Sequence, residues 1–302
     1  MSAEPPAVIS VVIPAYNAAG FILRTLESVL AQQVLPGRLE VVVVDDGSSD
    51  DTATLVSRLE GSVRLVTGPR RGVSAARNEG LRRSSGELVA FMDHDDLWRP
   101  DKLRRQAELM AASPRMALVF TQAEVEDGGV VTEIFPRLPE PEAFLARAYE
   151  NLVHWNYIPM SAVMARRSAL PEPAFDTRFS LAEDWDLWLR IAAQAGPGGV
   201  GFIAEPLTRY RIVAGRATER MADLRLEDIA IVSRELDRHP WLTASDPDRC
   251  RETLHRLYVE AGYWLLEEGR RAEARRLLAA AWRMKPASLK PLGHLLASLV
   301  PG

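Results

Sequence analysis

Short apolar runs alternate with segments of helical periodicity along the first third of the chain. The apolar runs are rich in β-branched residues and are bounded by proline, glycine or acidic residues, which is typical of buried strands. We therefore predict strands at residues 8–13, 39–44, 63–67 and 88–92, and helices at residues 21–30, 50–59 and 73–83. Strands that alternate with helices in this way predict an α/β protein with a parallel, doubly wound sheet.

After Pro100 the pattern becomes mixed. Asp127-Gly128-Gly129 lies between two strand-like segments, and glycines at this position favour a tight hairpin. Tryptophan, leucine and isoleucine give residues 183–195 an amphipathic helical pattern. The strands predicted here are residues 117–126, 130–135, 161–165, 200–203 and 207–212, and the helices are residues 101–112, 183–195 and a run that ends near residue 153.

From about residue 217 onwards the patterns are helical, with helices predicted at residues 221–238, 249–268 and 272–284. The spacing of small residues around Gly269 resembles one helix-turn-helix unit of a tetratricopeptide array. One such unit does not form an array alone, so we expect it to pack on the first domain or to offer a partner surface. The predicted domains are residues 1–215 and a helical region, partly tetratricopeptide-like, at residues 216–302.

Composition and charge narrow the class of protein. The chain has 302 residues, of which 47% are hydrophobic and 26% are charged, as in ordinary globular proteins. A net charge of −4 gives no reason to expect nucleic-acid binding. The single cysteine, Cys250, excludes an internal disulfide and a cysteine-rich zinc site. No signal peptide and no apolar stretch of about 18 residues is visible, so we predict a cytoplasmic location.

Acidic residues follow the apolar run at residues 88–92; they are Asp93, Asp95 and Asp96, grouped around His94. Ligands of open α/β sheets bind outside the carboxyl ends of the strands, so this position suits a site. Clustered carboxylates repel one another unless a cation or hydrogen-bond donors compensate. Mg2+ or Mn2+, shared with a substrate phosphate, would do so. The motif alone favours this interpretation no more than an acidic loop that caps the next helix.

Five segments, in one order over about 200 residues, together resemble the family 2 glycosyltransferases. They are Val-Val-Ile-Pro-Ala-Tyr-Asn (11–17), Val-Asp-Asp-Gly-Ser-Ser-Asp (44–50), Gly-Val-Ser-Ala-Ala-Arg-Asn-Glu-Gly (72–80), Phe-Met-Asp-His-Asp-Asp (91–96) and Glu-Asp-Trp-Asp-Leu-Trp (183–188). The resemblance covers residues 8 to about 213 and leaves out the helical tail. It implies a GT-A catalytic domain, a nucleotide-sugar donor, a divalent ion, and a one-step transfer that inverts the sugar carbon.

The resemblance also implies roles for single residues. Asp184 matches the catalytic base, and one base is enough because direct displacement needs no second carboxylate. Asp95 matches the metal ligand of the D-x-D motif, and Asp93 matches the acid beside it, which reaches the metal or the ribose. Tyr16 would stack on the base and Asp46 would bind the N–H of the base ring. The residues implied to bind the nucleotide are Pro14, Tyr16, Asp46, Arg77 and Asp93.

Structural alternatives exist for these residues. Tyr16 could be an ordinary residue of a loop. Asp46 could cap the turn through Gly47. Arg77 would ordinarily be a solvated side chain of a helix, or an ion-pair partner of Glu79 or Glu87. The resemblance instead places Asp46 and Arg77 near the base and the diphosphate. Both suit uracil, which makes UDP the expected nucleotide, with dTDP and GDP as the alternatives.

Further candidates surround the motifs; they are Glu183, Asp96, Trp98, Trp155 and Arg211. Acids at residues 183 and 184 could simply favour the positive end of a helix dipole. Asp96 would support the metal ligands or cap the next helix. Trp98 and Trp155 are candidate platforms for a sugar ring. Arg211 follows a late strand, where it would lie near the diphosphate or on the surface.

The acceptor and two other classes of protein have to be considered. The resemblance implies a glycan or lipid-linked acceptor in bacterial surface polysaccharide synthesis, with residues 136–180 building its site. A regulator that binds nucleotide sugars without catalysis would share the donor motifs but would not need Asp184. An Asp-x-Asp phosphatase fits less well, because it requires Thr or Val where this chain has Leu97.

The end of the chain is basic and apolar. Between Arg270 and Lys290 there are seven Lys or Arg residues against one acid, Glu273, and leucines follow as far as Val300. A basic helix with an apolar edge can lie on an anionic bilayer, which predicts peripheral contact with the inner face of the cell membrane. The alternative is a terminal helix that packs its leucines on the catalytic domain.

Overall fold

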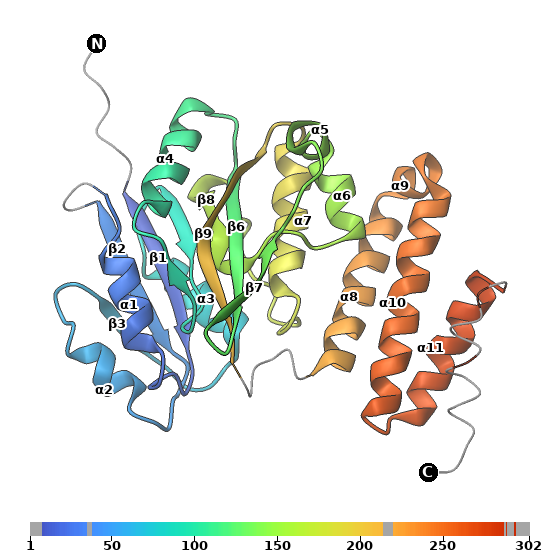
Figure 1. Cartoon of the computed structure of the whole chain (residues 1–302), viewed down its shortest axis with the longest axis horizontal. Coiled ribbons are helices and arrows are strands. Elements are labelled where there is room, and N and C mark those ends of the chain that lie inside the picture. Colours follow the sequence, from blue (N-terminus) through green and yellow to red (C-terminus); the bar gives the residue numbers. More distant parts are fainter. Residues whose placement is uncertain (1–7, 35–37, 214–219, 287, 289–292, 294–302) are drawn as a thin grey trace. The chain divides into compact units, whose positions relative to one another are not determined.

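The computed structural model of the chain describes residues 8–34, 38–213, 220–286, 288 and 293 (Figure 1). The chain divides into two compact units. The first is Met1–Leu152 with Asn156–Ala214, and the second is Val153–Trp155 with Gly215–Gly302. The first unit contains a nine-stranded sheet, and the described part of the second unit is helical.

The first half of the sheet is parallel, as the alternating pattern at the start of the chain predicts. Its strands are β1 (Ile9–Ala15), β2 (Leu39–Asp45), β3 (Arg64–Thr67) and β4 (Leu88–Phe91), in the order β3-β2-β1-β4. β1 is buried along its whole length, which explains its unbroken apolar run. Because these four strands run in one direction, their carboxyl ends lie at one edge of the sheet. The α/β fold class is confirmed.

The second half of the sheet is mixed, whereas we expected mostly parallel strands. Its strands are β5 (Leu97–Trp98), β6 (Leu118–Asp127), β7 (Val130–Phe135), β8 (Val163–Arg166) and β9 (Val200–Ile212). β8 runs antiparallel between β4 and β6, β9 runs parallel to β6, and β5 and β7 pair antiparallel with β9 and β6. The two predicted strands at residues 200–203 and 207–212 form one strand, because register shifts on both sides of Gln122 absorb the residues between them.

Helices flank the sheet in this part of the chain. They are α1 (Ile22–Leu30), α2 (Thr52–Ser57), α3 (Val73–Arg82), α4 (Lys102–Ala112), α5 (Pro141–Leu145), α6 (Ala148–His154) and α7 (Glu183–Ala195), with 3-10 turns η1 (Met160–Ala162) and η2 (Arg167–Ala169). α3 packs directly on the sheet, since a Cβ at Gly80 would lie 2.4 Å from Val12 Cγ1. This close approach holds the α3 residue Arg77 at a fixed height above β1 and β2.

The described part of the second unit contains α8 (Met221–Arg238), α9 (Pro240–Ser245), α10 (Pro247–Glu267) and α11 (Arg271–Met284). α9 was not predicted; it begins with Pro240, a residue that suits the first turn of a helix. α10 and α11 are close together, since a Cβ at Gly262 would lie 2.5 Å from Leu278 Cγ. Gly269 joins them with a φ of +75°, which glycine adopts readily. Among the described residues, no helix has the length and apolarity needed to cross a membrane.

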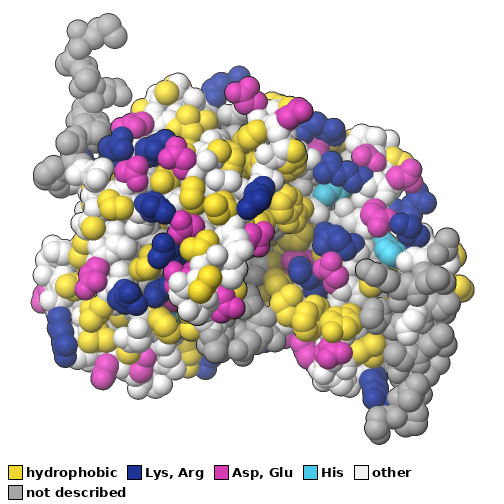
Figure 2. Space-filling view, in the orientation of Figure 1, with side chains coloured by type: hydrophobic (Ala, Val, Ile, Leu, Met, Phe, Trp, Pro, Cys, Tyr) yellow, Lys and Arg dark blue, Asp and Glu magenta, His cyan; other side chains and the backbone are white. Residues whose placement is uncertain are grey.

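The described surface carries side chains of mixed character. Figure 2 shows Lys and Arg side chains interspersed with Asp and Glu side chains, with apolar side chains between them, on the face that it presents. The charges on this face do not gather into one basic patch, in keeping with the modest net charge of the sequence. Among the large apolar side chains of the sheet, that of Val130 in β7 is the most exposed.

Candidate functional site

The loops that follow β1 and β2 are bound to each other at the carboxyl edge of the sheet. Asn17, whose φ is +48°, donates its N–H to Ser48 Oγ, and its side-chain oxygen accepts the N–H of Ser49; both distances are 2.9 Å. Asparagine tolerates this left-handed conformation better than most residues do. The contact brings Tyr16 and Asp46, two predicted nucleotide-binding residues, into neighbouring loops.

The carboxylate of Asp46 holds the loop that precedes α3. Its two oxygens accept the N–H groups of Arg71 and Gly72, both at 2.8 Å. The turn after β2 is instead capped by Asp45, whose carboxylate accepts a hydrogen bond from Ser48 Oγ. The alternative in which Asp46 caps its own turn is therefore wrong, and Asp46 joins the second loop to a third.

Tyr16 and Pro14 differ in their access to solvent. Tyr16 is half-buried, and the guanidinium carbon of Arg70 lies 4.3 Å from its ring centroid. Pro14 is buried inside β1, and its carbonyl oxygen lies 3.2 Å from His94 Nδ1. The Tyr16 ring is thus placed as a planar surface at the edge of the site, whereas Pro14 meets the acidic loop through its main chain.

The acidic loop at residues 93–96 is anchored through Asp96. This side chain is fully buried; its Oδ1 accepts the N–H of Arg211 at 3.1 Å and its Oδ2 accepts the hydroxyl of Ser161 at 2.6 Å. The next helix, α4, begins at Lys102, and the residue before it makes no side-chain cap. The helix-cap interpretation of Asp96 is therefore wrong, and Asp96 instead supports the loop that carries Asp93 and Asp95.

Arg77 connects the acidic loop to the start of α7. Its Nη2 lies 2.7 Å from Asp93 Oδ1, its Nη1 contacts Glu183 Oε1, and the ring of Phe175 lies beneath its guanidinium group. Burial would lower the pKa of Arg77, but the charges of Asp93 and Glu183 outweigh burial and raise it. The solvated alternative is wrong, and so is the pairing with Glu79, which binds other arginines.

Asp184 occupies the first turn of α7, as predicted for that helix. Its Oδ1 accepts the N–H of Trp185 at 2.6 Å and the Nδ2 group of Asn156 at 3.3 Å. Burial, together with the neighbouring charge of Glu183, raises the pKa of Asp184 to about 7. A carboxylate with a pKa near neutrality can accept a proton from a hydroxyl group much more effectively than an ordinary aspartate can.

Arg211 is buried at the acidic loop, so the alternative of a surface arginine is wrong. Its side chain is 8% exposed, and its Nε donates to the main-chain oxygen of Asp95. Its Nη2 has no hydrogen-bond partner among the described residues. Burial lowers the pKa of Arg211. A buried guanidinium with an unused donor is costly, which favours an anionic ligand beside Asp95.

The acidic loop offers a partial set of metal ligands. Within the described ranges, no three His, Cys, Asp or Glu side chains are grouped so that they could hold a metal ion by themselves. Mg2+ usually keeps several waters and binds one or two carboxylates together with substrate phosphates, so a complete protein cage is not required. Asp93 and Asp95 supply hard oxygen ligands at the loop, and this chemistry fits Mg2+ or Mn2+.

The two tryptophans predicted as sugar platforms have different environments. Trp98 is 5% exposed; its Nε1 donates to the carbonyl of Ser161 at 2.7 Å, and Lys102 Nζ lies 4.1 Å from its ring centroid. The platform prediction for Trp98 is therefore wrong, because the side chain is buried in the core and its N–H is bound to the main chain. Trp155 is 41% exposed and belongs to the second unit, and its role as a platform stays a prediction.

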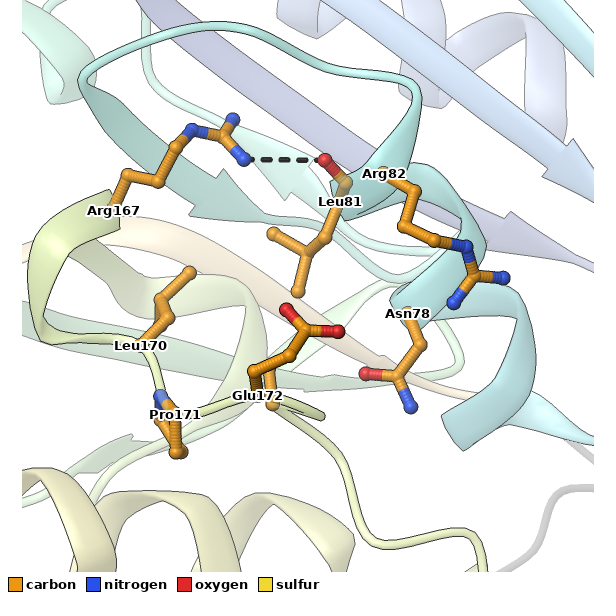
Figure 3. A pocket seen from close by; sticks show the side chains of 8 residues that line it. Asn78, Leu81, Arg82, Arg167, Leu170, Pro171 and Glu172 are labelled. Carbon is orange, nitrogen blue, oxygen red and sulfur yellow. Dashed lines mark hydrogen bonds between the residues drawn. The ribbon is translucent and has the colours of Figure 1, made fainter.

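A separate pocket of about 170 Å³ lies beside the carboxyl-terminal half of α3 and the segment after η2 (Figure 3). None of the predicted site residues lines it. Arg167 donates to the carbonyl oxygens of Leu81 and Gly86 and to Ser84 Oγ. The Arg167 guanidinium group therefore binds the protein's own main chain and Ser84.

Two residues of the site were missed from the sequence, namely Ser161 and Asn156. Both lie in residues 136–180, where no recurrent spacing or motif marks them. Ser161 stands at the start of the strand predicted at residues 161–165, and a polar residue at the start of an apolar run is the signal that would have pointed to it. Their contacts with Asp96 and Asp184 become visible only once the chain has folded.

Solved structures share this fold, and some of them contain a nucleotide or a nucleotide sugar. TarS residues 1–349 of S. aureus, solved with UDP, superposes with a TM-score of 0.58 at 16% identity, over 96% of this chain and 90% of that chain. The mannosyltransferase PcManGT of Pyrobaculum calidifontis, solved with GDP-Man and Mn2+, gives a TM-score of 0.59 at 23% identity, over 97% and 80%. At these identities the likeness defines the fold, which confirms the predicted GT-A type.

Sequence relatives extend the comparison. The amylovoran biosynthesis glycosyltransferase AmsB of Erwinia amylovora is 31% identical over 221 residues, 68% of this chain and 69% of AmsB. The succinoglycan biosynthesis protein ExoO of Rhizobium meliloti is 44% identical over 209 residues, 64% and 59% of the two chains. The UDP-Glc:alpha-D-GlcNAc-diphosphoundecaprenol beta-1,3-glucosyltransferase WfaP of Escherichia coli is 27% identical over 209 residues, 68% and 78%. The chain spans only about a third of the length of an uncharacterized glycosyltransferase from Rickettsia felis (34%).

The family follows from the sequence itself. Residues 10–170 match the model of glycosyl transferase family 2, which is more than half of the chain. The chain therefore belongs to glycosyl transferase family 2, and the resemblance deduced from its five segments is confirmed. The matched residues include the acidic loop and Arg77, whereas Asp184 lies beyond them.

Proposed function

We propose that this chain is an inverting glycosyltransferase that moves a sugar from a UDP-sugar to a hydroxyl group of a glycan or lipid-linked acceptor. The observation that carries the proposal is the buried contact series Asp93–Arg77–Glu183, which joins the acidic loop to the residue beside Asp184. This series supports the proposal because it connects Asp93, which would bind a diphosphate-bound cation, to the neighbour of Asp184, whose pKa of about 7 suits a general base.

The proposed reaction is a single displacement. Asp184 accepts the proton of the acceptor hydroxyl while the acceptor oxygen attacks the anomeric carbon, and the bond from that carbon to the diphosphate breaks with its electron pair leaving on the diphosphate. Asn156 orients the Asp184 carboxylate through its Nδ2 group. When bound, Mn2+ or Mg2+ would neutralise charge on the departing diphosphate, with Asp95 and Asp93 as its protein ligands.

The nucleotide would lie across the loops after β1 and β2. Tyr16 supplies a ring for stacking on the base, and the Asp46 oxygens, each with a further lone pair, can accept the N–H of uracil. The free Nη2 of Arg211 would donate to a diphosphate oxygen. Arg77 has a different role from the one first expected, because both its terminal nitrogens are engaged by acids. We assign it to the support of those acids.

The names of relatives support the donor and acceptor. WfaP is named for UDP-Glc and for an acceptor on diphosphoundecaprenol, and AmsB and ExoO are named for amylovoran and succinoglycan biosynthesis. These support a UDP-sugar and a lipid-linked acceptor in surface polysaccharide synthesis. The structure of PcManGT with Mn2+ supports a divalent ion.

The proposal is tested by nucleotide release from a panel of UDP-, dTDP- and GDP-sugars, with Mn2+ and then with EDTA. We expect release from one UDP-sugar that EDTA abolishes and that Asp95→Asn reduces at least tenfold. The matched control is Glu40→Gln, an acid at the opposite edge of the sheet, which should retain activity. UDP binding without turnover of any donor, with and without lipid-linked acceptors, would instead favour a nucleotide-sugar-binding regulator.

We also propose that the carboxyl-terminal end gives peripheral contact with the inner face of the cell membrane. The described part of this stretch, α11, carries Arg275, Arg276 and Arg283, and Trp282 is exposed on it. The leucine-rich stretch after residue 288 lies outside the described residues. A truncation before Lys285 should sediment less with anionic vesicles than the intact chain does; equal sedimentation would refute the contact.

A further inference from the structure

Ser161, in the turn η1, directs its polar atoms at the acidic loop and its surroundings. The side chain is 2% exposed. Its hydroxyl accepts the N–H of Asp93 at 3.0 Å and donates to Asp96 Oδ2 at 2.6 Å. Its carbonyl oxygen accepts the N–H of the Trp98 ring at 2.7 Å and the hydroxyl of Thr208 at 3.3 Å. One residue, distant in sequence, thus binds the loop at its first and last positions.

The hydroxyl proton of Ser161 is committed to Asp96, because a serine hydroxyl has one donor and two acceptor lone pairs. The other oxygen of Asp96 accepts the N–H of Arg211, and the Arg211 side chain donates to the carbonyl of Asp95. The carbonyl of Asp96 accepts a hydrogen bond from Thr25 Oγ1 at 2.9 Å. These contacts hold the loop on both sides of Asp95.

We propose that Ser161 is a positioning residue, which sets where Asp93 and Asp95 present their carboxylates to the divalent cation and the donor diphosphate. This inference rests on the proposed function. Ser161 itself does not touch the reacting atoms; it acts through the main chain of Asp93 and through the buried carboxylate of Asp96. Its removal should therefore weaken the binding of a metal–nucleotide complex beyond any loss of folding stability.

The chain contains a matched control for this claim. Ser10, at the opposite edge of the sheet, is fully buried; its hydroxyl accepts the N–H of Gly86 at 2.8 Å and donates to Glu40 Oε2 at 2.6 Å. Ser10 and Ser161 thus make the same two kinds of hydrogen bond, one from a main-chain N–H and one to a carboxylate. The two serines differ in location: Ser10 lies at the amino ends of the strands, and Ser161 binds the acidic loop at their carboxyl ends.

The experiment compares Ser161→Ala with Ser10→Ala in the full chain, by thermal unfolding and by calorimetric titration with Mn2+ and UDP. We expect both variants to lower Tm to a similar extent. Ser161→Ala should weaken Mn2+–UDP binding about tenfold, the size of effect that follows from the loss of a hydrogen bond to a charged group. Ser10→Ala should leave binding within about twofold, and Ser161→Thr, which restores the hydroxyl, should recover most of the affinity.

Two outcomes separate this inference from the proposed function. If the intact chain binds Mn2+–UDP and Ser161→Ala binds it equally well, or if Ser10→Ala weakens binding as much, the positioning role is refuted while the proposed function stands. If the intact chain binds no Mn2+–UDP, both are refuted. Should Ser161→Ala fail to fold, Ser161→Cys keeps the size of the side chain with a weak donor, and the same loss of binding is expected from it.

Discussion

In the first unit, the pKa of one acid is lowered at the amino ends of the strands, and that of another is raised at their carboxyl ends. At the amino edge, Glu40 accepts hydrogen bonds from the Ser10 hydroxyl at 2.6 Å and from the Ser85 N–H at 2.8 Å, with Arg64 at 3.7 Å. Burial alone would raise the pKa of Glu40, but these partners outweigh it and lower the pKa. The charged form of Glu40 is therefore stabilised by the folded protein.

At the carboxyl edge, Asp184 has fewer compensating partners and a like charge beside it. It accepts hydrogen bonds from Trp185 and Asn156, yet burial and Glu183 dominate and raise its pKa to about 7. The neighbouring cation, Arg77, is shared between Asp93 and Glu183. At Glu40 the hydrogen-bond and ion-pair partners outweigh burial, whereas at Asp184 burial and a like charge outweigh two hydrogen bonds and leave a carboxylate that can exchange a proton near neutral pH.

The largest expected effect comes from removing the acid that the carboxyl edge leaves poorly compensated. Asp184→Asn should lower turnover about 1,000-fold, within the range of general-base contributions. It should not lower Tm at pH 8, since it removes a charge whose burial is unfavourable. Glu40→Gln should do the reverse, with turnover within about twofold and a lower Tm. Similar losses of turnover in the two variants would contradict the distinction between Asp184 as a proton acceptor and Glu40 as a structural acid.

A second prediction concerns the arginines at the two edges. Arg77→Met leaves two acids without their buried cation and should reduce the free energy of unfolding by about 3 kcal/mol. Arg64→Met at the amino edge should cost at most about 1 kcal/mol, because the Arg64 side chain is 57% exposed whereas that of Arg77 is 4% exposed. Urea unfolding of both variants measures the difference, and equal losses would contradict the special position of Arg77.

The pH dependence should follow from the raised pKa of Asp184. Below about pH 7 this acid is protonated and cannot accept a proton, so kcat/KM should fall about tenfold per pH unit and level off above pH 7. In the folded state Asp184 binds a proton up to about pH 7, well above its ordinary pKa of 3.8, so its contribution to stability decreases as pH rises between these values. Glu40 behaves oppositely, because its contribution is lost as pH falls through its lowered pKa.

The measurements are a pH–rate profile and unfolding free energies of the intact chain and Asp184→Asn from pH 5 to pH 8. In Asp184→Asn, the residual kcat/KM should no longer fall below pH 7. The free energy of unfolding of this variant should also lose the part of its pH dependence that comes from Asp184. If kcat/KM of Asp184→Asn still falls below pH 7 as it does in the intact chain, another group is responsible for the titration.

The smallest expected effect lies at the rim of the carboxyl edge. Tyr16→Leu should raise the KM for the donor about tenfold and leave kcat unchanged, because base stacking on an aromatic ring contributes about 1–3 kcal/mol to binding in single-strand binders. Tyr263→Leu, which removes an exposed aromatic ring from the second unit, is the control and should leave KM unchanged. A loss of kcat with unchanged KM would remove Tyr16 from the nucleotide site.

The sequence predicted the first half of the fold well because its signals are local. β-branched runs and the acidic residues at their ends define the four parallel strands, and the family motifs mark Asp93, Asp95 and Asp184. Strand direction is not local, so within the mixed half of the sheet only the antiparallel hairpin of β6 and β7 was predicted from the sequence. Burial at the ends of strands is not local either, which explains why Trp98 was expected at the surface. The roles of the site residues stay predictions until the variants are measured.

The contact between Arg77 and Glu183 also bears on how relatives can be recombined. The family model covers residues 10–170, so this ion pair joins the matched segment to a helix outside it. A chimera that takes its donor half from one enzyme and its acceptor half from another would inherit one member of the pair from each parent. Parents that differ at either position would leave a buried charge alone at the junction. Exchange of acceptor specificity should therefore succeed most often when both residues are transplanted together.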